Sequence, residues 1–361
     1  MNPIKICSGT CKRSSRRKFI KNSLLTAGAI TLGGLSLHSA TNMQRRSNID
    51  ATSGATPIFR SDYVPGYLAL EESGELRRRE RRLWEIMRSC TLCPRNCRVN
   101  RMAGEKGECS SNDRLIVASA EISLAEERVT VGTRGTGSIF MSNCNLLCVF
   151  CQNWQINHRG LGTEITIEQL AEVMIALQDH HVHNIGIVTP THFTPHLVSA
   201  LRIAIRNGLN IPFLYNTGGY DSLEVIQLFD GIADMYIPDF KFQDCNIAAP
   251  FIQNAPDYTL HAAAAIKEMH RQVGDCKIEN GVMYRGVIIR HLVLPENLGG
   301  ADKLVRWVAN ELGTDTHINI MSQYRPEFRA RYHPPLDRRV TRAEYEQALR
   351  WAREAGLHNF H

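Results

Sequence analysis

Three cysteines stand close together in the segment SNCNLLCVFCQNWQ, residues 142–155, with the spacing C-x3-C-x2-C. Cysteine thiolates are ligands of zinc and of iron–sulfur clusters. Clusters that only carry electrons are normally closed by four protein ligands, and no fourth cysteine lies near these three. Cys144, Cys148 and Cys151, which we call the cysteine triad, therefore need an explanation that an ordinary four-thiolate site does not supply.

A second group of cysteines lies in CTLCPRNCRVNRMAGEKGEC, residues 90–109. Its C-x2-C and C-x3-C turns let neighbouring sulfurs point to one metal, and two glycines let the chain fold back before the last cysteine. Four thiolates suit zinc and an iron–sulfur cluster equally well. Disulfides or unrelated buried thiols are the alternatives to a metal. This cysteine quartet consists of Cys90, Cys93, Cys97 and Cys109.

Downstream of residue 130, short apolar runs alternate with amphipathic stretches. Thr166 with Gln169, and Thr341 with Glu344, form capping boxes at two predicted helix starts. The pattern predicts one helix that begins at residue 166 and another near 259–273. It predicts four more helices over 196–208, 222–231, 301–312 and 342–356. It predicts strands over 137–142, 184–189, 211–217, 233–241, 286–295 and 317–323.

These strands are continuous apolar runs, which is typical of a parallel sheet covered on both faces. Right-handed crossovers would curl six βα units into a partial (βα)6 barrel. Active sites of such sheets gather at the carboxyl ends of the strands, and the cysteine triad follows the first strand. The triad is therefore predicted to lie in the active site.

The motif CNLLCVFC after the first strand resembles the radical S-adenosylmethionine (SAM) superfamily. Further segments resemble its pyruvate formate-lyase activating enzyme-like, or PflX-type, subgroup: CTLCPRNC, GEKGEC, VTPTHFTP, YNTGGY, YIPDFKF, HLVLPENLGG and MSQYRP. The resemblance implies that the triad holds three irons of a [4Fe–4S] cluster and that SAM binds the fourth. Reductive cleavage of SAM then gives methionine and a 5′-deoxyadenosyl radical.

The resemblance also implies residues that contact SAM. Asp239 and Lys241 match a D-x-K element, although a strand-end salt bridge is the alternative interpretation. The G-G-E motif of activating enzymes is replaced here by VTPTHF. Arg290 and His291 are neighbours on one strand, so at most one should face inward. The predicted cofactor contacts are Thr189, Thr191, His192, Asn216, Thr217, Asp239 and Lys241.

The function implied is a radical SAM enzyme that activates a protein partner, as in glycyl radical enzyme activation. The alternatives are a radical SAM enzyme acting on a small molecule or peptide, an iron–sulfur electron-transfer protein, and a zinc-stabilised binding module. The implied partners are SAM, an electron donor such as flavodoxin or ferredoxin, and a protein substrate. Beyond residue 50 the chain carries 33 Lys/Arg and 35 Asp/Glu, which gives no electrostatic reason to expect a nucleic acid.

Residues 1–50 are basic, with nine Lys/Arg and one Asp. Arg16 and Arg17 precede an apolar run near 24–37 in an arrangement that resembles a twin-arginine export signal. Export, with cleavage or a weak membrane tether, is therefore expected, and a cytoplasmic location is the alternative. The predicted divisions are leader 1–40, linker 41–60, N-terminal segment with the quartet 61–130, radical SAM core 131–330, and C-terminal helix and tail 331–361.

Overall fold

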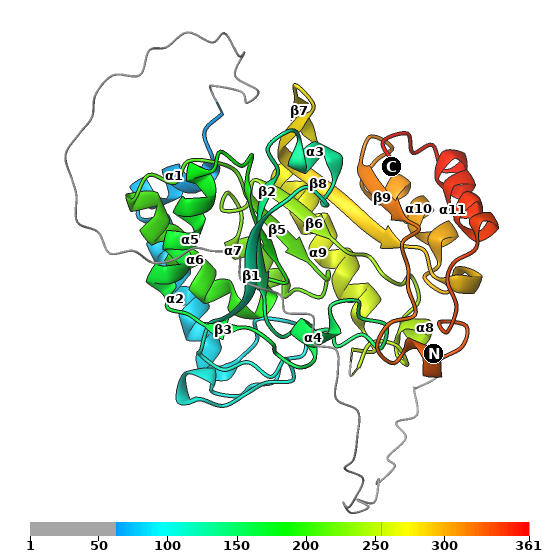
Figure 1. The fold of residues 1–361 in the computed structure, drawn as a ribbon, viewed down its shortest axis with the longest axis horizontal. Coiled ribbons are helices and arrows are strands. Elements are labelled where there is room, and N and C mark those ends of the chain that lie inside the picture. The colour runs from blue at the N-terminus through cyan, green and yellow to red at the C-terminus, as the bar shows by residue number, and fades with distance from the viewer. Residues whose placement is uncertain (1–62, 254, 361) are drawn as a thin grey trace, which may run out of the picture. The chain divides into compact units, whose positions relative to one another are not determined.

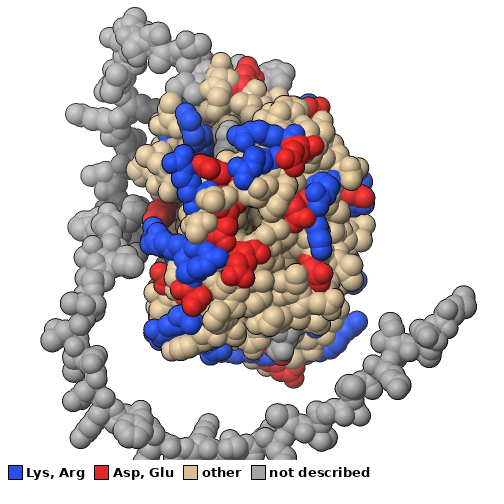
Figure 2. Space-filling view, turned by 90° about the vertical axis from the view of Figure 1, so that its right-hand side faces the viewer, with Lys and Arg blue, Asp and Glu red and all other residues tan. Residues whose placement is uncertain are grey.

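The computed structural model describes residues 63–253 and 255–360, all within one compact unit, Thr56–His361. The predicted leader 1–40, with its export signal, and the predicted linker 41–60 lie outside the described residues. Within the described ranges, no helix has the length and apolar content needed to cross a bilayer. On the face shown in Figure 2, Lys and Arg side chains are interspersed with Asp and Glu.

Six strands pair in parallel and form the centre of the sheet (Figure 1). Each corresponds to one strand predicted from the sequence, so the partial (βα)6 barrel is confirmed. Among the described strands the last pairs only with its predecessor, which leaves the barrel open at one edge. In spatial order the strands are β2 (Thr136–Met141), β4 (Ile185–Val188), β5 (Phe213–Thr217), β6 (Met235–Pro238), β8 (Val282–Leu292) and β9 (His317–Met321).

The predicted helices also form, and both capping boxes are present. The helix after β2 shows the reason: Leu170, Met174 and Leu177 recur at helical spacing and are buried against the sheet. Burial of the apolar strands is seen at β5, where all five residues are buried. The helices are α5 (Ile167–Asp179), α6 (Thr194–Arg206), α7 (Leu223–Leu228), α9 (Tyr258–Val273), α10 (Ala301–Glu311) and α11 (Arg342–Glu354).

Three antiparallel strands and two N-terminal helices were not predicted. The strand next to β2 has the sequence IVASAEIS. Its small and polar residues interrupt the apolar pattern from which a strand would be predicted. It extends the sheet beyond β2, and α2 packs on α6. These elements are α1 (Gly66–Glu72), α2 (Glu75–Ile86), β1 (Ile116–Ser123), β3 (Thr163–Glu164) and β7 (Lys277–Glu279), with short helices α3 (Arg128–Val131), α4 (Trp154–Asn157) and α8 (Cys245–Ala248).

Candidate active site

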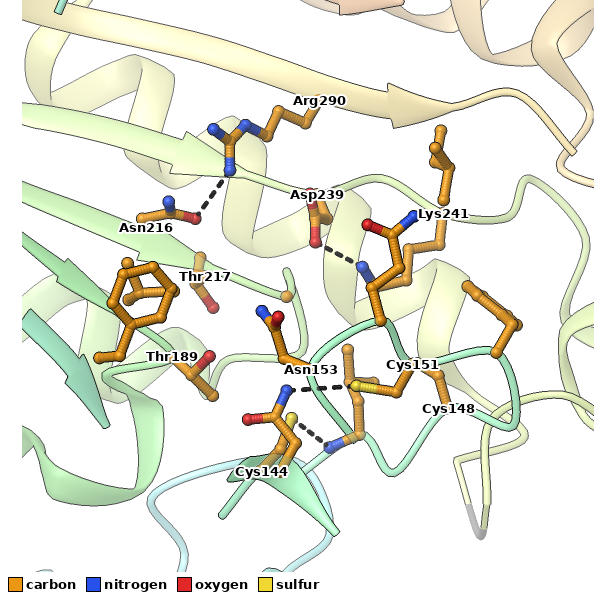
Figure 3. Close-up of a pocket in the computed structure, with 18 of the residues that line it drawn as sticks. Cys144, Cys148, Cys151, Asn153, Thr189, Asn216, Thr217, Asp239, Lys241 and Arg290 are labelled. Atoms are coloured by element: carbon orange, nitrogen blue, oxygen red, sulfur yellow. Dashed lines mark hydrogen bonds and ion pairs between the residues drawn. The ribbon is translucent and has the colours of Figure 1, made fainter. Parts of the chain in front are cut away.

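A cavity of about 490 Å³ lies at the carboxyl ends of the parallel strands (Figure 3). Every parallel strand, or the loop that follows it, contributes a lining side chain. The cysteine triad comes from the loop after β2, and Figure 3 shows it on one side with Arg290 at the far side. The other strands supply Thr189, Asn216, Thr217, Asp239, Lys241 and Met321.

The thiols of the triad are largely shielded from water. Cys144 and Cys148 are buried, and Cys151 is partly buried. The Leu146 N–H donates to Cys144 Sγ over 3.3 Å, and Asn157 Nδ2 donates to Cys151 Sγ over 3.3 Å. Burial raises the pKa of Cys144 to about 11 and also raises the pKa values of the other two thiols. The sulfurs therefore become ligands only when a bound cation displaces their protons.

The residues fit an iron–sulfur cluster better than a single ion. Among the described residues, no three His, Cys, Asp or Glu side chains converge where one metal ion could be held. In a cluster each thiolate binds a different iron, so the triad sulfurs need not converge on one point. The N–H groups that point at two of the sulfurs are the kind of outer contact that tunes such clusters.

Asp239 and Lys241 form an ion pair that lines the same cavity. Burial lowers the pKa of Lys241, but the Asp239 carboxylate and the Cys148 thiol outweigh it, so that the pKa of Lys241 lies above its usual value. The backbone here is fixed by Tyr258, whose hydroxyl donates to the Asp239 carbonyl over 2.9 Å and accepts from the Lys241 N–H over 3.0 Å. The cavity thus contains an ammonium ion and a carboxylate in fixed positions near the triad.

Not all of the predicted cofactor contacts are brought together. Thr189 lines the cavity, and its φ of +62° turns the chain away directly after β4. Thr191 is buried elsewhere and donates to Asp221 Oδ1 over 2.7 Å. His192 is also buried outside the cavity, and its Nε2 lies 2.8 Å from the Ser142 carbonyl. His192 therefore contacts the backbone just before the triad and does not line the cavity.

Arg290 was predicted only as one of two alternatives, and the structure decides between them. Its guanidinium lines the cavity and pairs with Glu126 over 2.6 Å and Glu127 over 2.8 Å. The next residue, His291, faces away and approaches the Phe240 carbonyl over 2.8 Å. The prediction that at most one of the two faces inward is confirmed. Glu126 had no sequence signal, because it lies in the loop after β1, 164 residues before its partner.

The cysteine quartet lies outside the cavity lining. Cys90, Cys93 and Cys109 are buried and Cys97 is partly buried, and all four are free thiols. Burial raises the pKa of Cys93 to about 12, and nearby Cys90 and Cys109 contribute to the raised pKa values of both Cys93 and Cys97. The Glu108 N–H also donates to Cys97 Sγ over 3.4 Å. The four thiols thus gather in one region beside the barrel.

Comparison with known proteins is consistent with this geometry. Residues 138–308 match the radical SAM superfamily. A protein of Methanocaldococcus jannaschii, described as uncharacterized protein MJ0674, is 32% identical over 282 residues, which cover 75% of this chain and 76% of the relative. The chain belongs to the radical SAM superfamily. A second protein of that organism, uncharacterized protein MJ0808, is 23% identical over 266 residues, covering 68% of this chain and 73% of the relative.

Membership in the radical SAM superfamily assigns the general chemistry. The chain is an iron–sulfur enzyme that uses a [4Fe–4S] cluster and SAM. The matched region begins within β2 and includes the cysteine triad, whereas the quartet at residues 90–109 lies outside it. The radical SAM fold therefore accounts for one cysteine group and leaves the other to be explained.

Proposed function

We propose that the cysteine triad holds the [4Fe–4S] cluster and that SAM binds beside it, against Asp239, Lys241, Asn216, Thr217 and Thr189. One observation carries this proposal: three thiols and a fixed carboxylate–ammonium pair line one cavity at the carboxyl ends of the strands. SAM is itself zwitterionic and carries hydroxyl groups, so it offers partners to both charges. An ion pair with only a structural role would not need to line this cavity.

When bound, the cluster and SAM supply reductive cleavage to methionine and a 5′-deoxyadenosyl radical. The chain supplies position and shielding for this chemistry. Leu146 N–H and Asn157 hold two sulfurs by hydrogen bonds, and Lys241 keeps a positive charge near the thiolates. Phe140, Leu147 and Leu292 provide apolar wall, which limits the access of water to reactive groups.

The substrate we propose is a protein partner whose backbone receives the radical, as in the activation of glycyl radical enzymes. The described sheet does not close between β9 and its β1–β3 side, and this open edge supports the proposal, because a partner loop needs more room than a closed barrel allows. A peptide or small molecule as substrate is the second candidate. Isotope transfer from deuterated substrate into 5′-deoxyadenosine distinguishes them, since only the true substrate loses its label to that product.

Electrons must reach the cluster, and the proposed donor is an acidic redox protein such as flavodoxin or ferredoxin. Arg159, Arg329 and Arg331 are exposed near the loop after β2, and the Arg329 N–H donates to the Val149 carbonyl within that loop. Basic residues at this place favour an acidic partner. We expect the rate of cluster reduction by flavodoxin to fall as salt rises, and to fall at low salt in Arg329→Glu.

We further propose that the leader directs export of the folded enzyme. Arg16 and Arg17 carry this proposal, because the twin-arginine route transports folded proteins and so protects cluster thiols from disulfide formation. Fractionation of the native protein beside an Arg16→Lys, Arg17→Lys variant tests it. Retention of both proteins in the cytoplasm with Met1 attached would exclude export and leave the barrel chemistry untouched.

Anaerobic reconstitution with iron and sulfide, followed by reduction with dithionite and assay of 5′-deoxyadenosine from SAM, tests the enzyme proposal. We expect product from the native protein and from Cys276→Ala, a matched control whose thiol lies outside the cavity. An electron-transfer protein would be reduced without cleaving SAM. A reduced cluster without any 5′-deoxyadenosine would therefore contradict the proposal.

A further inference from the structure

The segment that carries the cysteine quartet lies directly against the loop that carries the cysteine triad. We call residues 142–153 the triad loop. Contacts reach the residues on both sides of Cys144, and the two cited hydrogen bonds join residues that are 50 and 32 positions apart in the sequence. The radical SAM match begins at residue 138, so this packing joins matched and unmatched parts of the chain.

Arg95, which lies between Cys93 and Cys97, makes the most extensive of these contacts. Its guanidinium donates to the backbone carbonyls of Asn145 and Leu146, the latter over 3.1 Å. It also donates to the Gln253 carbonyl, which lies outside the triad loop. A planar guanidinium can hold several carbonyls at fixed angles, which the single ammonium of lysine cannot do.

Two further contacts reach the triad loop independently of Arg95. Asn143 Nδ2 donates to Ser111 Oγ over 2.9 Å, just beyond the end of the quartet. The Asn145 side chain donates to the Tyr220 carbonyl over 2.6 Å and also interacts with the Cys93 sulfur. Both residues next to Cys144 are therefore held from outside the loop.

The backbone of the triad loop explains why such contacts are needed. Asn143 has φ +70° and Leu147 has φ +55°, and a leucine in the left-handed region is strained. Such a strained conformation persists only when the surrounding structure holds it. Without external contacts the loop would relax, and the directions of the thiols at residues 144 and 148 would change with it.

We propose that the quartet segment clamps the triad loop and that Arg95 is the positioning residue of this clamp. Arg95 holds the Asn145–Leu146 carbonyls so that the three thiols face the cavity together. The inference rests on the triad being the cluster site, as proposed above. It gives the unmatched quartet segment a role in the radical SAM chemistry that does not depend on a metal in the quartet.

Hydrogen–deuterium exchange of the metal-free protein under anaerobic conditions tests the clamp without relying on catalysis. We expect Arg95→Met to speed exchange about tenfold or more at Leu146, Val149 and Cys151, whose N–H groups donate within or beside the loop. Exchange in α5 should stay unchanged. Arg98→Met, at an exposed position on the same turn, is the matched control. Arg95→Lys should lie between the native protein and Arg95→Met.

Unchanged exchange in the triad loop of Arg95→Met, or an equal increase in Arg98→Met, would overturn the clamp. If Arg95→Met fails to fold, Ser111→Ala removes the tie on the other side and should speed exchange of the Asn143–Cys144 region alone. No increase there would likewise contradict it. Absence of SAM cleavage in the native protein would defeat the proposed function while leaving these exchange results readable, so that the two failures are distinguishable.

Discussion

The cysteine triad and the cysteine quartet use the same ligand atom in different surroundings. The triad follows β2 and lines a cavity that also contains Asp239 and Lys241. The quartet lies beside the barrel, outside that lining, and contacts the triad loop through Arg95 and Asn145. The two groups thus differ in position relative to the strand ends, where active sites of such folds gather, and not in the type of ligand atom.

The largest expected effect is on 5′-deoxyadenosine formation, which should depend on the cysteine triad far more than on the cysteine quartet. Cys148→Ala should lower 5′-deoxyadenosine formation by at least about 1000-fold, because one iron loses its thiolate. Cys97→Ala should keep activity within about tenfold of native, because Cys97 lies outside the cavity lining. Cys97 is the suitable partner for this comparison, since Cys93 interacts with the triad loop through Asn145. Iron, zinc and product are measured together.

Equal loss of activity and of the SAM-sensitive cluster in both variants would contradict this division. The two groups would then form parts of one functional centre. Cys245→Ala, in α8, controls for nonspecific effects of removing a thiol.

A smaller effect tests whether the Asp239–Lys241 pair binds SAM or only stabilises the fold. Lys241→Met should weaken SAM binding about 10- to 100-fold. It should also lower the free energy of unfolding by about 1–3 kcal/mol, because it leaves the partly buried Asp239 carboxylate without its cation. The double variant Asp239→Asn, Lys241→Met should regain stability but not affinity. Calorimetric titration with SAM and thermal melting measure the two quantities.

Recovery of SAM affinity in the double variant would assign the pair a purely structural role. Lys303→Met, on α10, is the matched control for loss of one ammonium. It should leave SAM affinity unchanged, because Lys303 does not line the cavity.

The smallest expected effect is on the pH dependence of stability, which depends on three buried histidines. His192 and His196 contact the Ser142 and Asp113 carbonyls, and His291 contacts the Phe240 carbonyl. Burial lowers the pKa of His192 to about 3, and the pKa values of His196 and His291 to about 4, from 6.5. Because each folded-state pKa lies below its unfolded value, the stability is present above pH 6.5 and is lost as pH falls toward 4.

Urea unfolding of the metal-free protein at pH 7.5 and 5.5 measures this dependence. Each histidine should contribute about 1 kcal/mol of the loss at pH 5.5. His196→Gln should reduce the loss by about that amount, whereas His358→Gln, at an exposed position, should not. An identical pH dependence in His196→Gln would show that its buried imidazole is not protonated on unfolding in this range.

Much of the barrel could be predicted from the sequence, because its strands are unbroken apolar runs. β1 could not, since its alanines and serines give no clear period. The triad was apparent from spacing alone. Thr191 and His192 were predicted to contact the cofactor but do not line the cavity. Thr189 reverses the chain, and the short helix Thr191–Phe193 turns both side chains away. No local pattern could pair Arg290 with Glu126, which only the closed tertiary fold brings together.

The central claim is that the cysteine triad leaves one iron of its cluster open to SAM. Electron paramagnetic resonance of the reconstituted, reduced protein, recorded with and without SAM, tests it most directly. We predict a [4Fe–4S]⁺ signal whose shape changes when SAM is added, in the native protein and in Cys97→Ala alike. A signal that SAM leaves unaltered in the native protein would contradict the account.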